Sequence, residues 1–230
     1  MTNNNIIPPE IYNDEFSEDL IKIIKNNDLN HILEIGSSNG EGSTTVIVKA
    51  ILNRSFFSDV NLLCLEASVE RFKSLKKRFQ DFSFVKCFNS SSIKLEEFPS
   101  DEKIKNFYKN IKTNLNKFSE QTIISWLNDN KNYIIQNNIK TNEIENIKKN
   151  LRIQNFDFVL IDGSEFTGEV ELSKVIGSKF IALDDIKTYK NYFSHKTLME
   201  NKDYSVLKIN TRLRNGYSIF KLNEYFEIDE

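Results

Sequence analysis

Short apolar segments alternate with longer segments of helical periodicity along most of the chain. Seven apolar segments are rich in β-branched and aromatic residues and predict strands at His31–Ile35, Asn61–Leu65, Phe82–Phe88, Phe156–Ile161, Lys179–Leu183, Ser205–Ile209 and Tyr217–Leu222. The first five are continuously apolar, which is typical of parallel strands that are covered on both faces. Apolar residues recur every three or four positions before and between these strands and predict a preceding helix at Glu10–Asn27 and further helices at Ser43–Asn53 and Ser68–Phe79.

This order of elements predicts one α/β domain over residues 1–230. Strand–helix alternation is typical of a doubly wound, Rossmann-like sheet with right-handed crossovers. The last two strands are separated only by residues 210–216, too few for a crossover helix, so we expect an antiparallel hairpin with Asn215 and Gly216 in its turn. The fold class is therefore a seven-stranded sheet, mostly parallel, that ends in an antiparallel hairpin.

Residues 93–151 interrupt the alternation. This segment is rich in Lys, Asn, Glu and Ile, lacks glycine and contains the only tryptophan, Trp126. Its apolar residues fall at helical spacing and predict a helical insertion of two or three helices. Two interpretations stay open: a lid over a binding site, and an elaborated crossover with no direct role.

Composition and charge narrow the class of protein. The formal net charge of -2 and the sequence pI of about 5.9 argue against nucleic acid as the main partner. No apolar stretch is long enough to cross a bilayer, and residues 1–10 lack the features of a secretory signal. Cys64 and Cys87 lie inside apolar segments and are expected to be reduced, buried thiols of a cytoplasmic protein. A homo-oligomer stays open.

The strongest motif surrounds the first predicted strand, in the stretch HILEIGSSNGEGST. Glu34 ends the strand, and a loop with Gly36 and Gly40 leads into a helix that Ser43 or Thr44 is expected to cap. Glycines allow close backbone approach at the edge where open α/β sheets bind ligands. The pattern is E-x-G-x-x-x-G, whereas a dinucleotide site requires G-x-G-x-x-G. It resembles the first motif of class I methyltransferases, whose ligand carries no phosphate.

Polar residues also follow the second and third strands. Glu66 can accept both hydroxyls of an adenosine ribose, or it can cap the helix that begins near Ser68. In the methyltransferase layout Asn89 and Ser90 flank the adenine, although polar residues in this position also suit an ordinary loop. The predicted cofactor-binding residues are Glu34, Gly36, Ser37, Gly40, Ser43, Thr44, Glu66, Ala67, Asn89, Ser90 and Asp162.

Three carboxylates, Asp162, Asp184 and Asp185, follow the fourth and fifth strands. Clustered carboxylates repel one another unless a cation or a proton offsets them. A set of oxygen ligands suits Mg²⁺, Mn²⁺ or Ca²⁺ rather than zinc. In the alternative interpretation, Asp184 and Asp185 only cap the next helix.

The combination of I-D-G at residues 161–163 with L-D-D at residues 183–185 resembles the divalent-metal-dependent O-methyltransferases. It is most similar to the macrocin and aminocoumarin sugar methyltransferases, and more distantly to catechol O-methyltransferase. The resemblance implies that Asp162, Asp184 and Asp185 bind a metal ion such as Mg²⁺, which in turn binds substrate hydroxyls. The sugar enzymes place an acid directly after I-D-G. This chain has Ser164 there, and Glu165 one position later is expected to substitute.

Together these motifs predict a metal-assisted, S-adenosylmethionine-dependent O-methyltransferase that acts on a hydroxylated small molecule or sugar. Asp162 and Glu165 are the expected catalytic residues, and Tyr189, Tyr192 and Phe193 are candidates for a wall of the substrate site. Two rival functions stay open. One is a nucleotide-binding oxidoreductase, and the other is a non-catalytic protein that binds S-adenosylmethionine and uses the insertion as an interaction surface.

Overall fold

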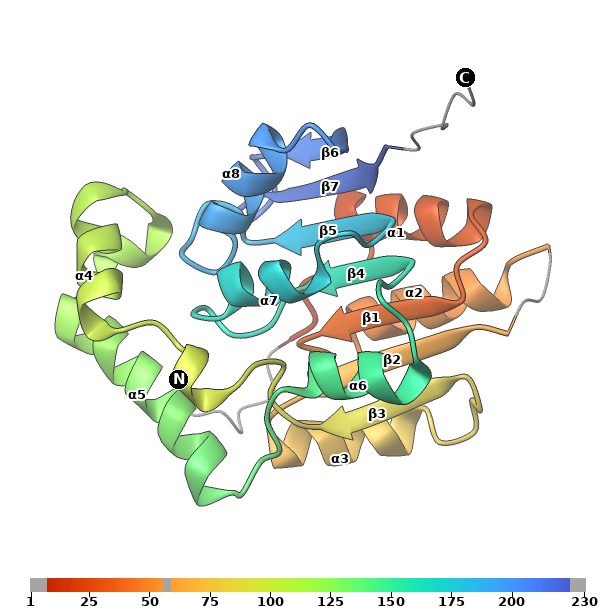
Figure 1. Ribbon diagram of the computed structural model, residues 1–230, viewed down its shortest axis with the longest axis horizontal. Helices are drawn as coiled ribbons and strands as arrows, with labels where there is room; N and C mark the ends of the chain where they lie inside the picture. The colour runs from red at the N-terminus through yellow and green to blue at the C-terminus, as the bar shows by residue number, and fades with distance from the viewer. Residues whose placement is uncertain (1–7, 56–58, 224–230) are drawn as a thin grey trace.

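The computed structural model describes residues 8–55 and 59–223 and arranges the described strands in one sheet (Figure 1). The strand order is β3-β2-β1-β4-β5-β7-β6. The strands are β1 (His31–Ile35), β2 (Asn61–Glu66), β3 (Val85–Asn89), β4 (Phe158–Ile161), β5 (Phe180–Asp184), β6 (Tyr204–Asn210) and β7 (Tyr217–Leu222). The first five are parallel, whereas β7 is antiparallel to both β5 and β6. The predicted sheet and its terminal hairpin are confirmed. Residues 1–7, which belong to the segment judged not to be a secretory signal, and 224–230, at the predicted domain end, lie outside the described residues.

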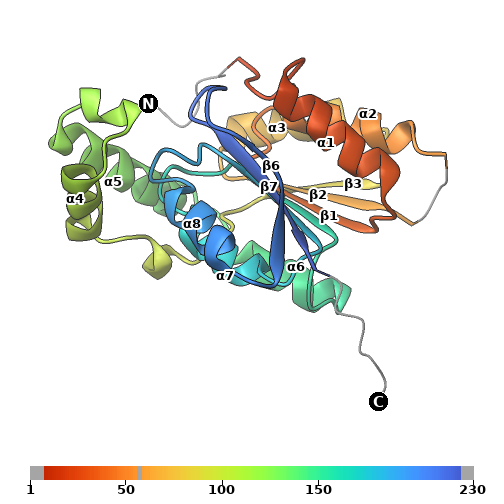
Figure 2. The ribbon, with the colours of Figure 1, turned by 90° about the horizontal axis from the view of Figure 1, so that it is seen from above.

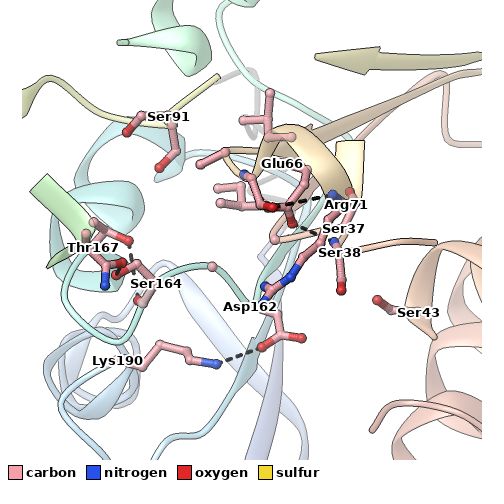
Figure 3. Close-up of a pocket in the computed structure, with 18 of the residues that line it drawn as sticks. Ser37, Ser38, Ser43, Glu66, Arg71, Ser91, Asp162, Ser164, Thr167 and Lys190 are labelled. Carbon is pink, nitrogen blue, oxygen red and sulfur yellow. Dashed lines mark hydrogen bonds and ion pairs between the residues drawn. The ribbon is translucent and has the colours of Figure 1, made fainter. Parts of the chain in front are cut away.

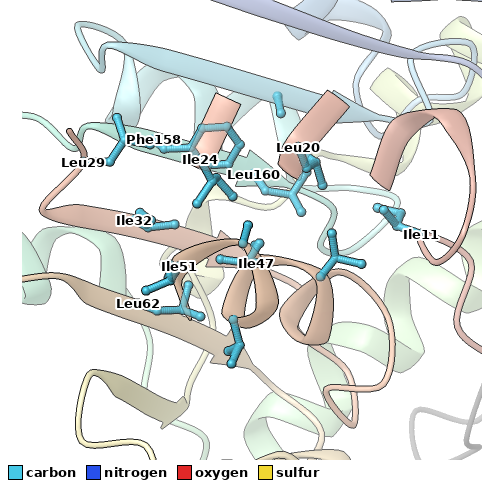
Figure 4. Packing of buried hydrophobic residues seen from close by; sticks show 14 of the residues in the cluster. Ile11, Leu20, Ile24, Leu29, Ile32, Ile47, Ile51, Leu62, Phe158 and Leu160 are labelled. Atoms are coloured by element: carbon cyan, nitrogen blue, oxygen red, sulfur yellow. The ribbon is translucent and has the colours of Figure 1, made fainter. Parts of the chain in front are cut away.

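Helices cover both faces of the sheet, as a doubly wound fold requires (Figure 2). One face carries α1 (Glu15–Asn26), α2 (Ser43–Leu52) and α3 (Val69–Arg78). The other face carries α6 (Glu143–Leu151), α7 (Gly168–Val175) and α8 (Tyr192–Glu200). Each layer encloses one apolar cluster. Figure 4 shows the cluster beneath α1 and α2, where Leu20 and Ile47 contact strand residues such as Ile32 and Leu160.

Local hydrogen bonds explain where the predicted helix starts are wrong. Helix α1 begins at Glu15 rather than Glu10, because the Asp14 carboxylate accepts the Ser17 backbone N–H at 2.8 Å and the Ser17 hydroxyl accepts the Asp14 N–H at 2.9 Å. At α2 the predicted cap by Ser43 or Thr44 is wrong. The N-cap is Gly42, with no side-chain cap bond, and the Thr44 hydroxyl turns to Glu34 instead.

The third strand also starts later than predicted. Phe82 and Phe84 lie before β3 and pack edge-on, with ring centroids 5.8 Å apart, and Phe82 packs in the same way on Phe79. Backbone bonds from Phe82 to Phe79 and from Val85 to Phe82 close a turn in this segment. The apolar run that suggested a longer strand therefore fills the space beside the end of α3.

The predicted insertion divides into two parts. Helices α4 (Asp101–Asn110) and α5 (Glu120–Gln136), with the short 3-10 helices η1 (Leu95–Glu97) and η2 (Asn114–Lys117), stand beside the sheet around their own apolar cluster (Figure 1). Helix α6 instead packs Ile144 and Ile147 onto the sheet and serves as the crossover helix into β4. Among the described residues, no helix has the length and apolarity that a membrane span requires.

Candidate active site at the carboxyl edge of the sheet

A pocket of about 310 Å³ lies at the carboxyl ends of β1, β2 and β4 (Figure 3). This volume is at the lower end of the range for small-molecule sites, about 300–1,000 Å³. The structure brings many of the predicted site residues to its lining: Gly36, Ser37, Ser43, Glu66, Ala67, Ser90, Asp162 and Asp185. The other predicted residues lie behind this lining: Glu34, Gly40, Thr44, Asn89, Glu165 and Asp184.

The loop after β1 is held against the ends of the neighbouring strands. The backbone N–H groups of Gly36 and Ser37 both donate to the Leu65 carbonyl at 3.0 Å. Gly36 has φ +91°, and a Cβ there would lie 2.1 Å from the Asp162 carbonyl oxygen. Only glycine therefore fits this close approach. The Ser37 hydroxyl is buried beside the Cys64 thiol, whose pKa burial raises and this hydroxyl acts to lower.

Gly40 serves a different contact from the one predicted. Its φ is +81°, and a Cβ would lie 2.6 Å from the ring of Phe79. Gly40 thus lets the far side of the loop pack on α3. Glu34 and Thr44 lie beneath the loop, both fully buried, where the Thr44 hydroxyl donates to Glu34 Oε2 at 2.6 Å. Glu34 Oε1 has no partner among the described residues.

Glu66 is the last residue of β2 and faces the pocket. Its Oε2 accepts the Ser38 backbone N–H at 2.8 Å, and its Oε1 accepts the Ser68 N–H at 2.6 Å. Burial raises the pKa of Glu66, and the Ser68 N–H, the positive charge of Arg71 and the Ser38 N–H oppose that rise. A carboxylate offers about four acceptor positions. These two bonds leave acceptor capacity for the hydroxyls of a ligand.

The residues that end β3 have separate roles. Asn89 donates its side-chain N–H groups to the carbonyls of Glu66 and Ala67, at 2.9 and 3.0 Å. Its amide therefore braces the turn after β2. Ser90 lines the pocket, and its buried hydroxyl has no partner among the described residues.

The three predicted aspartates come together, with ligand oxygens of Asp162, Asp184 and Asp185 within 4.8 Å of one another. A lysine that the sequence interpretation missed lies among them. Lys190 Nζ is 2.8 Å from Asp162 Oδ1 and 2.6 Å from Asp185 Oδ2 (Figure 3 shows the first of these contacts). Arg214, from the hairpin turn, lies 3.4 Å from Asp184 Oδ1. The only sequence signal for Lys190 is a basic residue in the segment that follows the fifth strand.

The charges in this cluster shift the pKa values of the aspartates in different directions. Burial, together with the charges of Asp184 and Asp185, raises the pKa of Asp162 against the opposing effect of Lys190. Burial also acts to raise the pKa of Asp185, but the Lys190 ammonium and the Asn215 amide hold it below its ordinary value. Burial acts to lower the pKa of Lys190, and the three carboxylates raise it well above its ordinary value. Lys190 therefore carries a charge at neutral pH. Burial and the neighbouring Asp185 carboxylate also raise the pKa of Asp184, to about 6.

The carboxylate cluster does not fit a divalent ion as it stands. Such an ion needs the oxygens of Asp162 and Asp185 as ligands. One oxygen of each, Asp162 Oδ1 and Asp185 Oδ2, is paired with the Lys190 ammonium, at 2.8 and 2.6 Å. The three aspartates come together as predicted, with the Lys190 ammonium among them; their role as metal ligands stays a prediction.

Glu165 lies one layer behind the pocket. Its Oε1 accepts the Tyr108 hydroxyl at 2.9 Å, and its Oε2 accepts the Thr188 hydroxyl at 3.0 Å. Burial raises the pKa of Glu165 to about 7, although Lys190 and the two hydroxyls act to lower it. The carboxylate links α4 of the insertion to the segment after β5. Its predicted catalytic role stays a prediction.

The insertion lines the pocket, whereas the aromatic residues that were predicted to form a wall of the substrate site do not. From α5, Asn130, Tyr133 and Ile134 line the pocket, and the Ser164 hydroxyl donates to Asn130 Oδ1 at 3.1 Å. This placement favours the lid interpretation. Tyr189, Tyr192 and Phe193 do not line the pocket; they pack edge-on around Phe107 of α4. These aromatic residues attach the insertion to α8.

Solved structures with the same architecture place this site in context. No protein-family model and no curated protein sequence matches the chain. It is similar to a Staphylococcus aureus protein assigned as a caffeoyl-CoA O-methyltransferase (TM-score 0.58, 12% identity, covering 93% of this chain and 85% of that one). The O-methyltransferase TomG from Streptomyces achromogenes, in complex with SAM, gives a TM-score of 0.54 at 12% identity, with 95% and 84% covered.

A third similar structure is the O-methyltransferase from Bacillus cereus in complex with SAH, with a TM-score of 0.52, 12% identity, and 96% and 83% covered. At this level of identity the similarities show the fold. The chain has the Rossmann-like fold of class I S-adenosylmethionine-dependent O-methyltransferases.

Proposed function

We propose that the protein transfers a methyl group from S-adenosylmethionine to a hydroxyl oxygen of a small molecule or sugar. The observation that carries the proposal is the set of polar atoms that converge on one pocket. Glu66 retains acceptor capacity, and Ser90 and Asp162 line the same pocket. A pocket with a few convergent polar groups is suited to a small ligand.

The lining divides into parts that suit the parts of the cofactor. Glu66 is suited to the two ribose hydroxyls, because a carboxylate accepts a diol through both oxygens. Ser90 is placed for the base, and the loop at Gly36 and Ser37 for the amino-acid end. Glu34 supports this loop from beneath. When bound, S-adenosylmethionine supplies a methyl group that is activated by positively charged sulfur. SAM and SAH are bound in the TomG and Bacillus cereus structures of this fold.

The residues of this chain then have two tasks. Asp162 lines the pocket with a raised pKa and would take the proton of the acceptor hydroxyl. Helix α5 lines one side through Asn130 and Ile134, which would exclude water and hold the acceptor in place. Such alignment supplies much of the rate enhancement in a transfer whose donor is already reactive. The proposed transfer does not use Mg²⁺, because Lys190 pairs with the carboxylates that would bind the ion.

The test is a transfer assay with methyl-labelled S-adenosylmethionine and a panel of phenolic, catecholic and sugar acceptors. We expect label in at least one class of hydroxylated acceptor. Asp162→Asn should lower kcat by about 100-fold, the lower end of the usual effect of a general base, while SAH still binds. Asp129→Asn changes an exposed carboxylate of α5 and should leave kcat unchanged.

Binding of SAH without transfer to any acceptor would contradict the proposal and favour a non-catalytic binding protein. Wild-type activity in Asp162→Asn would contradict the assignment of the base alone. These two outcomes separate the reaction from the residue that assists it.

A further inference from the structure

We propose that the Lys190 ammonium is the resident cation of the carboxylate cluster, in the place that the I-D-G and L-D-D motifs suggest for a divalent ion. Lys190 would hold Asp162 and Asp185 in place and present an N–H to the acceptor oxygen. The second part of this proposal rests on the proposed methyl transfer, whereas the first part does not.

The geometry of the ion pairs carries the proposal. Lys190 Nζ bridges Asp162 Oδ1 at 2.8 Å and Asp185 Oδ2 at 2.6 Å. All three side chains are largely buried, with 11%, 21% and 12% of their surfaces exposed, in the order Lys190, Asp162, Asp185. A buried ammonium paired with two carboxylates is held far more strongly than a surface pair, because removing it leaves buried charges without a partner.

The surrounding groups account for the remaining charge. Asp184 lies 3.4 Å from Arg214, and Asp185 also accepts the Asn215 side-chain N–H at 2.9 Å. Arg214 also pairs with Asp14, so its charge is shared between Asp14 and Asp184. Lys190 and Arg214 offset part of the repulsion among the three carboxylates of the cluster.

The backbone fixes Lys190 in this position. Its neighbour Asn191 is fully buried and donates to the carbonyls of Ile161 and Asp184, at 3.0 and 2.7 Å. These bonds attach the segment to the ends of β4 and β5. On the other side, a Cβ at Gly168 would lie 1.9 Å from the Lys190 carbonyl oxygen, so α7 packs directly against this backbone. Lys190 is thus built into the frame that holds the aspartates.

The third N–H of Lys190 points to its role toward the ligand. An ammonium has three donors, and among the described residues Lys190 bonds only to Asp162 and Asp185. Lys190 also lines the pocket beside Asp162. One donor therefore remains for an oxygen of the acceptor, at the point where the proton is removed.

The test is a titration of the full chain with Mn²⁺, followed by the electron paramagnetic resonance of the free ion. Wild-type protein is expected to show no site up to about 1 mM Mn²⁺. Lys190→Met removes the ammonium and keeps much of the side-chain volume. It should bind one Mn²⁺ at least about tenfold more tightly than wild type, and adding Asp185→Asn should abolish that binding.

Three controls keep the result interpretable. Lys187→Met removes an exposed lysine of the same segment and should gain no Mn²⁺ site. Lys190→Arg keeps the positive charge and should likewise gain no Mn²⁺ site, and thermal unfolding shows whether each variant is folded. Wild-type transfer activity is expected to persist in EDTA.

One Mn²⁺ bound tightly by the wild type and lost in Asp185→Asn would overturn the proposal. So would a folded Lys190→Met protein that gains no Mn²⁺ site. SAH calorimetry on the same samples tests the proposed function separately, because SAH binding is measured without Mn²⁺.

Discussion

The Glu66 carboxylate accepts the Ser38 backbone N–H at 2.8 Å, so the end of β2 holds the glycine loop that follows β1. The other carboxylate oxygen accepts the Ser68 N–H at 2.6 Å at the start of α3. Glu66 therefore ties together two sides of the pocket and still offers acceptor positions to a ligand. Ser68, rather than Glu66, is the N-cap of α3, and the ligand role of Glu66 stays a prediction.

Glu66→Gln should weaken SAH binding by about 10- to 100-fold, because one acceptor oxygen becomes an N–H donor that faces the ligand hydroxyls or the backbone N–H groups. Isothermal titration calorimetry measures the change. Glu70→Gln alters an exposed residue of the next helix and is the matched control, with no expected effect. Equal affinities for Glu66→Gln and wild type would remove the ribose role.

Gly36→Ala should destabilise the fold by more than about 3 kcal/mol, since its Cβ would lie 2.1 Å from the Asp162 carbonyl oxygen and its φ is +91°. Gly42→Ala is the control from the same loop, where the nearest atom to a Cβ is 3.4 Å away. Gly42 lies at φ -87°, ψ -120°, which strains an alanine, so that substitution should destabilise the fold as well but by less than Gly36→Ala. Urea unfolding compares the two, and similar losses in both variants would show that the close approach at Gly36 is absent.

Glu165→Gln should change how stability depends on pH. The folded-state pKa of Glu165 is about 7, above its ordinary value of 4.5, so the folded protein binds the extra proton between these values. In the wild type, the proton on Glu165 contributes its full stabilisation of the fold below about pH 4.5. This contribution is lost as the pH rises through about 7. Relative to the wild type, Glu165→Gln should therefore be up to about 3 kcal/mol more stable at pH 8 than at pH 5.

Urea unfolding of the wild type and of Glu165→Gln, each at pH 5 and pH 8, checks the direction of this change in stability. Glutamine keeps the shape of the side chain, and the Tyr108 and Thr188 hydroxyls can each donate or accept. A stability difference that does not depend on pH would show that Glu165 titrates as an exposed carboxylate does.

The layout of the fold could be predicted from sequence because continuous apolar runs and the short link before the last strand are local patterns. The carboxylates at the strand ends were likewise predictable, since parallel strands end at one edge of the sheet. Lys190 and Arg214 could not be found in this way. They reach Asp162 and Asp184 from a later loop and from the hairpin turn, and only the three-dimensional arrangement pairs them.

Side-chain direction was the other limit. Thr44 was expected to cap α2, but its hydroxyl bonds to the buried Glu34 carboxylate. Asn89 was expected at the adenine, but its amide bonds to the carbonyls of Glu66 and Ala67. A sequence pattern places such residues in the correct loop without showing which neighbour satisfies their hydrogen bonds.

Titration calorimetry of the wild-type protein with SAH tests the central claim most directly. We predict one SAH bound per chain with a Kd below about 100 μM, and no heat from NAD⁺ under the same conditions. Absence of SAH binding at about 1 mM, in protein shown to be folded, would contradict the assignment of this pocket to S-adenosylmethionine.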